Sequence, residues 1–175
     1  MREFRSFGAF AEHLLTREAV VVAAWHEVLE PIGAMVAHTA REKIGEYQDA
    51  EGPFPEWAPL AEATVEDRIA KGFSADEPLL RTGDLRDSIS HAVEGLEVAV
   101  GSTSDIAVYQ ELGTERIPPR PFLGPAVYQN GGHIVAALGA VTVNGIAGGK
   151  LIKSTIGYQG EFRASAIGLE REALK

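Results

Sequence analysis

The chain has 175 residues, of which 45% are apolar and 23% charged, and it contains no cysteine. This composition is typical of one globular domain with its own core, and it excludes disulfides, thiolate nucleophiles and cysteine metal sites. The net charge of −9 is concentrated in residues 1–110, which hold 20 acidic and nine basic side chains, a net of −11, and this argues against binding of nucleic acid through its phosphates.

The N-terminus gives no sign of a membrane or of secretion. Residues 1–5 lack the apolar run of a signal peptide, and the most apolar window, Ala19 to Ala24, is too short to span a bilayer. We therefore expect a soluble protein with no membrane contact.

Three helical stretches are predicted before residue 48. Apolar residues recur with a helical period over residues 4–15, and Thr16 is a suitable N-cap for a second helix that reaches Leu29. Pro31 is expected to break or kink the path, because its ring clashes with the preceding turn and it has no N–H group. A third stretch follows over residues 32–47.

A loop and a short helix come next. Trp57 and Leu60 are expected to anchor the proline-rich loop 49–59 onto the domain. A polar helix from Glu62 to Lys71 is predicted to end at Gly72, because glycine is the usual residue just after a helix.

The following segment predicts a short helix and a hairpin. Thr82 is expected to cap the helix, with Leu85 and Ile89 on its inward face. Residues 93–100, with Glu94-Gly95 at the turn, predict a β-hairpin whose alternate side chains face inward.

A helix and a proline-rich arm follow the hairpin. The helix begins at Ser104 or Asp105 and ends at Gly113, and its apolar positions are Ile106, Tyr109 and Leu112. The arm, Gly113–Pro125, contains four of the chain's nine prolines. Each proline fixes φ and removes a donor, so the arm is expected to be extended and to dock with little loss of entropy.

The C-terminal part predicts a helix from Ala126 to Val143, an edge strand over residues 151–156 and a terminal helix over residues 162–174. We expect one domain over residues 1–144, followed by a glycine-broken segment over residues 145–175. The fold class is α+β, with N-terminal helices packed on a small antiparallel β-sheet, then the arm and a further helix.

The sequence contains no complete motif for metal binding, phosphate binding or acid–base catalysis. His26-Glu27 begins like a zinc-protease helix, but position 30 is a glutamate where the second histidine must stand. The stretch Gly145–Leu151 is one residue too short for a phosphate-binding loop and is interpreted as a flexible connector. Asp84 and Asp87 are explained by capping and surface pairing. We therefore expect no enzyme activity, no metal and no cofactor.

Several segments taken in order resemble a known family. They are Trp57-Ala-Pro-Leu60, Leu79-Leu-Arg-Thr-Gly-Asp-Leu-Arg-Asp-Ser-Ile89, Val98-Ala-Val-Gly-Ser102, Tyr109-Gln-Glu-Leu-Gly-Thr114 and Ile117-Pro-Pro-Arg-Pro-Phe-Leu-Gly124. This series is similar to the virion-morphogenesis, or tail-completion, proteins and the related neck and minor tail proteins of long-tailed phages. The resemblance covers residues 30–127.

The resemblance implies a non-catalytic virion protein at the junction of head and tail, made in the host cytoplasm. It implies a ring of identical subunits, six as a first expectation, which contacts the tail tube or tail terminator and the connector proteins while genomic DNA passes without specific binding. Phe122 is the expected buried anchor of the arm and Arg120 its charged clamp, on either the same or a neighbouring subunit. The side chains expected at interfaces are Arg81, Arg86, Glu111, Arg116, Pro119, Arg120 and Phe122, and the structural anchors are Trp57, Leu60, Leu85, Ile89 and Tyr109.

Three alternatives remain open. The first is a tail terminator or a head–tail adaptor on the portal side. The second is a small hydrolase or ligand-binding protein that uses Asp84, Asp87 or His133, and the third is an interaction module outside phages.

Overall fold

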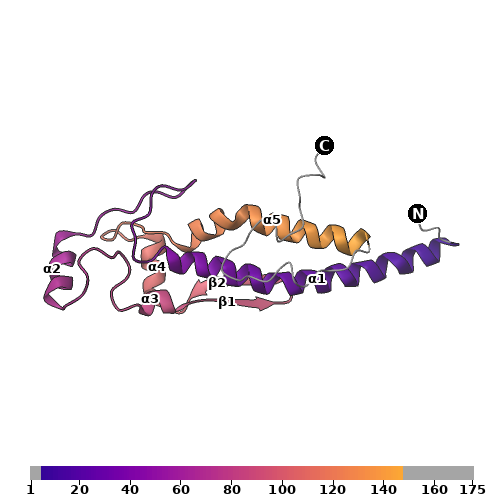
Figure 1. Ribbon diagram of the computed structural model, residues 1–175, viewed down its shortest axis with the longest axis horizontal. Helices are drawn as coiled ribbons and strands as arrows, with labels where there is room; N and C mark the ends of the chain where they lie inside the picture. The colour runs from indigo at the N-terminus through magenta and orange to yellow at the C-terminus, as the bar shows by residue number, and fades with distance from the viewer. Residues whose placement is uncertain (1–4, 148–175) are drawn as a thin grey trace. The chain divides into compact units, whose positions relative to one another are not determined.

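The computed structural model describes residues 5–147. Its elements in chain order are α1 (Phe7–Glu42), α2 (Glu62–Ala70), α3 (Asp84–Asp87), β1 (Ile89–Glu94), β2 (Glu97–Ser102), α4 (Asp105–Leu112) and α5 (Leu123–Ala147) (Figure 1). Helices pack on a two-stranded antiparallel sheet, and the predicted α+β fold class is confirmed. The chain divides into two compact units, Met1–Ile32 with Val93–Val98 and Gly132–Lys175, and Gly33–Ala92 with Ala99–Gly131.

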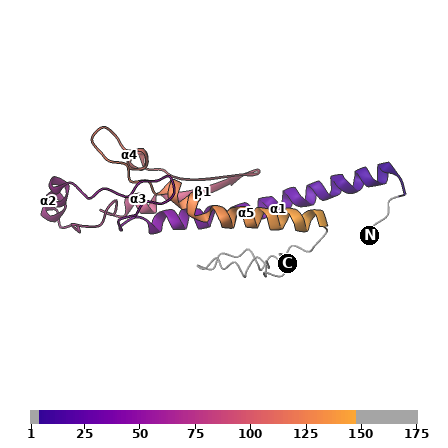
Figure 2. The same cartoon turned by 90° about the horizontal axis from the view of Figure 1, so that it is seen from above.

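In the first unit, the middle of α1 runs alongside the C-terminal part of α5, and the first turns of α1 continue past the end of α5 (Figure 2). Ala24, Val28 and Ile32 of α1 pack with Ala137 and Val141 of α5 in a buried apolar cluster. A polar contact crosses the same surface, where the Trp25 indole Nε1 donates to the Thr142 hydroxyl at 2.8 Å. Burial of apolar area between the two helices, rather than helix propensity, stabilises this unit.

The two helices approach closely at Gly145. A Cβ added there would lie 2.5 Å from Val21 Cγ2, so a larger residue would push the helices apart. The interpretation of residues 145–151 as a flexible connector was wrong for its first three residues, because α5 continues to Ala147. The expected domain boundary after residue 144 therefore falls inside this helix.

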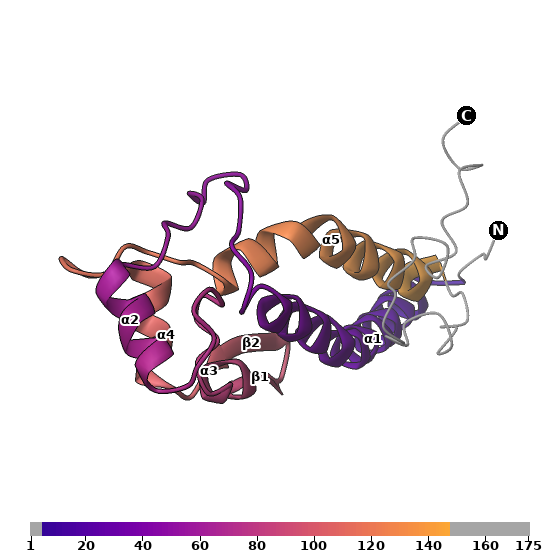
Figure 3. The same ribbon diagram turned by 60° about the vertical axis from the view of Figure 1, so that its left-hand side comes forward.

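The second unit groups α2, α3 and α4 with the loops between them (Figure 3). Its fully buried side chains include Ile89 at the start of β1 and Phe122 at the end of the arm, and Trp57 is 4% exposed. Arg41 ties α1 to the sheet, because its Nη2 donates to the Ile89 carbonyl.

Residues 7–42 form one helix, which contradicts the predicted break at Pro31. The flanking residues Val28, Ile32 and Met35 are buried, and their packing outweighs the hydrogen bond that the proline removes, at a cost of about 3 kcal/mol. Thr16 is not an N-cap either, since its hydroxyl donates to the Glu12 carbonyl at 2.9 Å inside the helix.

The continuity of α1 also overturns the argument that no apolar segment is long enough to span a bilayer. An 18-residue window of this helix has a mean hydropathy of 1.4, and 39% of the window is buried inside the protein. Length and composition alone thus make α1 a candidate membrane span. Core helices of other proteins pass the same test.

The shorter elements match their predictions more closely. Helix α2 begins at Glu62 as expected, and the hairpin turns at Gly95-Leu96. Helix α4 ends before Gly113, but its apolar face was misplaced. Its buried residue is Ala107, whereas the apolar positions Ile106, Leu112 and Tyr109, the last of them an expected anchor, are all more than half exposed. The strand and helix predicted after residue 150 lie outside the described residues.

Candidate functional site: an arginine-lined pocket beside the proline arm

The arm, Gly113–Pro125, doubles back on itself directly after α4. Gly113 has a φ of 72°, a left-handed conformation that favours glycine, and an added Cβ would lie 2.9 Å from the Pro119 nitrogen. The Thr114 N–H donates to the Ile117 carbonyl at 2.8 Å and closes a turn. The arm is therefore folded, and the expectation of a simply extended segment was wrong because Gly113 permits the reversal.

Glu111, in the last turn of α4, caps α5 from outside that helix. Its carboxylate accepts hydrogen bonds from the N–H groups of Phe122 at 2.8 Å, Leu123 at 3.0 Å and Gly124 at 2.8 Å. The first N–H groups of a helix have no partner within it, and its N-terminus carries a partial positive charge. Glu111 supplies acceptors for these N–H groups and a negative charge beside the helix N-terminus, and so it fixes the direction in which α5 leaves the arm.

Arg120 and Trp57 join the arm to the loop before α2. The Arg120 guanidinium donates from Nη2 to the carbonyls of Ala58 at 2.9 Å and Pro59 at 3.0 Å, and Trp57 Nε1 donates to the Pro121 carbonyl at 3.0 Å. Phe122, the next residue after Pro121, is fully buried. In this chain, Arg120 and Phe122 are therefore held by their own subunit.

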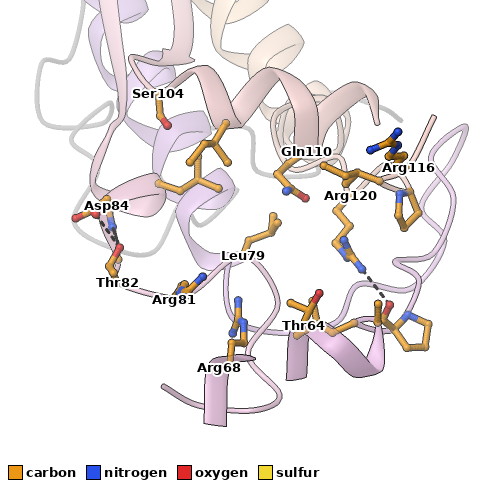
Figure 4. A pocket seen from close by; sticks show the side chains of 18 residues that line it. Thr64, Arg68, Leu79, Arg81, Thr82, Asp84, Ser104, Gln110, Arg116 and Arg120 are labelled. Carbon is orange, nitrogen blue, oxygen red and sulfur yellow. Dashed lines mark hydrogen bonds between the residues drawn. The ribbon is translucent and has the colours of Figure 1, made fainter. Parts of the chain in front are cut away.

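A cavity of about 510 Å³ lies beside this junction, between α2, α4 and the arm. Four arginines line it, together with a single carboxylate among the described lining residues, that of Asp84 (Figure 4). We call it the arginine pocket. Its arginines are Arg68, Arg81, Arg116 and Arg120.

Two of these arginines are buried without a carboxylate. Arg68 and Arg120 are each 5% exposed, and no ion pair with either is found within residues 5–147. Arg68 Nη1 donates to three carbonyls, of Ser74, Glu77 and Leu80, with the shortest distance 2.7 Å to Glu77. Burial holds the pKa of Arg120 below its usual value, Tyr47 opposes that shift, and the charge of Arg68 adds to it.

The pocket also contains strained backbone and an unsatisfied polar atom. Leu79 has a φ of 64°, the one positive value found for a non-glycine residue between residues 5 and 147, which costs of order 1–2 kcal/mol. Gln110 extends from α4 toward the cavity, and its Oε1 is buried with no hydrogen-bond partner in the described chain (Figure 4). Features of this kind concentrate at functional sites.

The structure brings some of the predicted interface residues together and separates others. Arg81, Arg116 and Arg120 line the pocket, whereas Arg86 pairs with Asp87 at 3.2 Å outside the lining, and Pro119 is exposed in the arm. Arg81 also contacts Asp67 at 3.0 Å. Whether any of them contacts a neighbouring subunit stays a prediction.

The predicted structural anchors are buried or half-buried with one exception. Trp57, Leu85 and Ile89 are buried and Leu60 is half-buried, but Tyr109 is 52% exposed. Of the residues of the hydrolase alternative, Asp84 lines the pocket and Asp87 does not, and His133 belongs to the other unit. Within residues 5–147, no group of three or more acidic or histidine side chains is placed to hold a metal ion.

Arg68, Leu79 and Gln110 were missed from the sequence. Arg68 is on a short polar helix, where an arginine is normally solvated, and its burial depends on the loop that follows. No sequence signal marks the conformation of Leu79 or the orientation of Gln110, since both depend on which segments enclose the cavity.

The candidate site consists of the proline arm and the arginine-lined cavity beside it. The arm is fixed by its own chain, and the lining combines guanidinium groups with exposed apolar residues. The sequence model of the phage virion morphogenesis family matches residues 7–131. The chain belongs to this family and is a protein of phage virion assembly. Comparison with curated proteins and with solved structures finds no significant match.

Proposed function

We propose that this protein is a tail-completion or neck protein at the head–tail junction of a long-tailed phage. In this role identical copies form a ring that joins the tail to the head and lets DNA pass. Family membership supports a role in virion assembly, and the order of the segments within residues 57–124 supports this particular place in the particle. Six subunits remain the first expectation.

The observation that carries the proposal is the fixed arm inside the region that matches the family. Glu111, Trp57 and Arg120 hold Gly113–Pro125 through backbone hydrogen bonds, so the surface beside it forms before any partner arrives. A preformed surface loses little entropy on docking, which favours a protein that joins two finished assemblies.

The charge of the chain supports the passage of DNA. A net charge of −9 repels phosphate, so a ring of such subunits would not retain the genome by non-specific contacts. The four arginines of the pocket are instead gathered in one cavity, where two of them are enclosed.

The test is deletion of the gene from a phage or inducible prophage that encodes it. We expect filled heads and complete tails that fail to join, with joining restored by the wild-type gene supplied in trans. Cryo-electron microscopy of restored particles should place the protein as a ring at the upper end of the tail. Normal particles without the gene, or density on the portal face, would contradict the tail-side placement.

A further inference from the structure

The two enclosed arginines of the pocket form no ion pair with a carboxylate within residues 5–147. Arg68 and Arg120 are almost fully enclosed, and their hydrogen-bond partners within residues 5–147 are backbone carbonyls, which carry only partial charge. Asp84, the one carboxylate found in the described lining, accepts a hydrogen bond from the Thr82 hydroxyl at 2.7 Å. Enclosed guanidinium groups are stabilised by carboxylates that bond to them directly, so an acidic occupant fits this cavity.

One buried acceptor of the cavity receives no hydrogen bond from the described residues. The buried Oε1 of Gln110 is an acceptor without a partner in the described chain. A backbone N–H supplies such a donor, and Ile106 of α4 adds an apolar rim that is 55% exposed. The three requirements together, an anion, a donor and apolar surface, describe a segment of polypeptide better than a small ion.

The tip of the hairpin, Glu94–Glu97, has the complementary features. A two-residue turn places Glu94 directly opposite Glu97, and the Thr103 N–H, which donates to the Ser88 carbonyl, agrees with this register. Like charges in direct cross-strand pairs repel each other. Leu96, between them in the turn, is 46% exposed.

We propose that the arginine pocket of one copy of the chain receives the Glu94–Glu97 tip of a second copy. The guanidinium groups relieve the repulsion between Glu94 and Glu97, and Leu96 contacts the apolar rim. Charge complementarity favours the Glu94–Glu97 tip over residues 148–175, which carry five basic and three acidic side chains and would bring the wrong sign. A pocket on one surface and a tip on another make a head-to-tail contact, which closes into a ring when the rotation allows.

The first test uses the absence of native cysteine. One chain carries Leu96→Cys and a second, larger tagged chain carries Thr64→Cys, since Thr64 is an exposed lining residue. We expect a mixed disulfide under mild oxidation, several-fold above that formed with an Ala63→Cys chain, whose site is exposed but outside the lining. Trapping of this kind detects the contact even when the wild-type chain is monomeric at equilibrium. Equal yields from the two pairs would overturn the proposal.

The second test uses charge reversal at exposed positions, so that folding is retained. A tip variant carries Glu94→Arg with Glu97→Arg, and a pocket variant carries Arg81→Glu with Arg116→Glu. When both crosslinking partners carry the tip variant, or both carry the pocket variant, the Leu96–Thr64 crosslink is expected to be lost. When a chain with the pocket variant is mixed with a chain with the tip variant, the unchanged tip of the first still fits the unchanged pocket of the second, and this pair should crosslink. Lys71→Glu is the matched control and should crosslink like the wild type, because Lys71 is exposed and pairs with Asp67 as Arg81 does but lies outside the lining. Unchanged crosslinking by the tip variant would contradict the proposal.

A third test, with inorganic phosphate, distinguishes the contact between copies from a site that binds only a small anion. Phosphate that binds at millimolar concentration without reducing the crosslink, together with equal yields for Thr64→Cys and Ala63→Cys, identifies a small-anion site and overturns the contact between copies. The crosslinking result does not depend on where the protein sits in the phage particle. Cryo-electron microscopy decides the proposed function, whereas the crosslink with purified chains decides this contact.

Discussion

Glu111 accepts hydrogen bonds from three consecutive backbone N–H groups at the start of α5, and each depends on an acceptor oxygen of one carboxylate. Glu111→Gln keeps the size of the side chain but replaces one oxygen with a donor and removes the charge. We expect the free energy of unfolding to fall by about 1–3 kcal/mol, because at least one part-buried N–H loses its partner. Urea denaturation of the purified chain measures this change.

Glu115→Gln is the matched control for that measurement. Glu115 is exposed in the same arm, and its substitution should change stability by less than about 0.5 kcal/mol. If the two variants unfold at the same urea concentration, the carboxylate of Glu111 does not hold the start of α5 in solution.

At the scale of elements, α2 contains a pH-dependent contact. Lys71 at 2.5 Å and Arg81 at 3.0 Å hold the pKa of Asp67 below its ordinary value, with the hydrogen bond from Lys71 the larger cause. A carboxyl whose pKa is lower in the folded state stabilises that state above its unfolded pKa of about 4 and loses the effect as pH falls through the folded pKa. Asp67→Asn should therefore lower the melting temperature slightly at pH 7 and have no effect well below pH 3.

The effect should be small because Asp67 is a solvated surface group, and added salt should reduce it further. Glu66→Gln, an exposed neighbour on α2, is the control and should show no such dependence on pH. A destabilisation by Asp67→Asn that stays constant from pH 7 to pH 2 would show that its partners act by packing rather than by charge.

The comparison of predicted and observed elements has a physical explanation. The stop at Gly113 and the hairpin turn at Gly95 were predicted because both are local, and both glycines have positive φ. The break at Pro31 was wrong because burial of neighbouring turns is a tertiary effect, and the face of α4 was wrong for the same reason. Of the pocket, the sequence indicated the arginines of the recognised segments, but not Arg68, whose burial depends on residues 74–80 folding over it.

At the scale of the whole molecule, the exposed apolar residues are not evenly distributed. On α1, Phe7, Leu14 and Leu15 are more than half exposed, and α4 exposes most of its apolar side chains. Exposed apolar surface of this kind is typical of sites that contact another protein or a membrane, which is consistent with the contact between copies proposed above. The acidic surface and the enclosed arginines fit the same interpretation, because a chain with this net charge needs complementary contacts to bind a copy of itself.

The apolar character of α1 leads to a prediction about membranes. Helix α1 is apolar and long enough to cross a bilayer, but Ala24, Val28 and Ile32 pack against α5, and Trp25 bonds to Thr142. Crossing a bilayer would break that hydrogen bond and place Glu27 and Glu30 in the apolar interior, where charged groups are expensive. We therefore expect the expressed chain to remain in the supernatant after alkaline carbonate extraction.

Retention in the membrane pellet would show that α1 exchanges its packing on α5 for lipid. Val28→Ala, which weakens that packing, should then increase the pelleted fraction, whereas Val20→Ala, at a more exposed position of the same helix, should not.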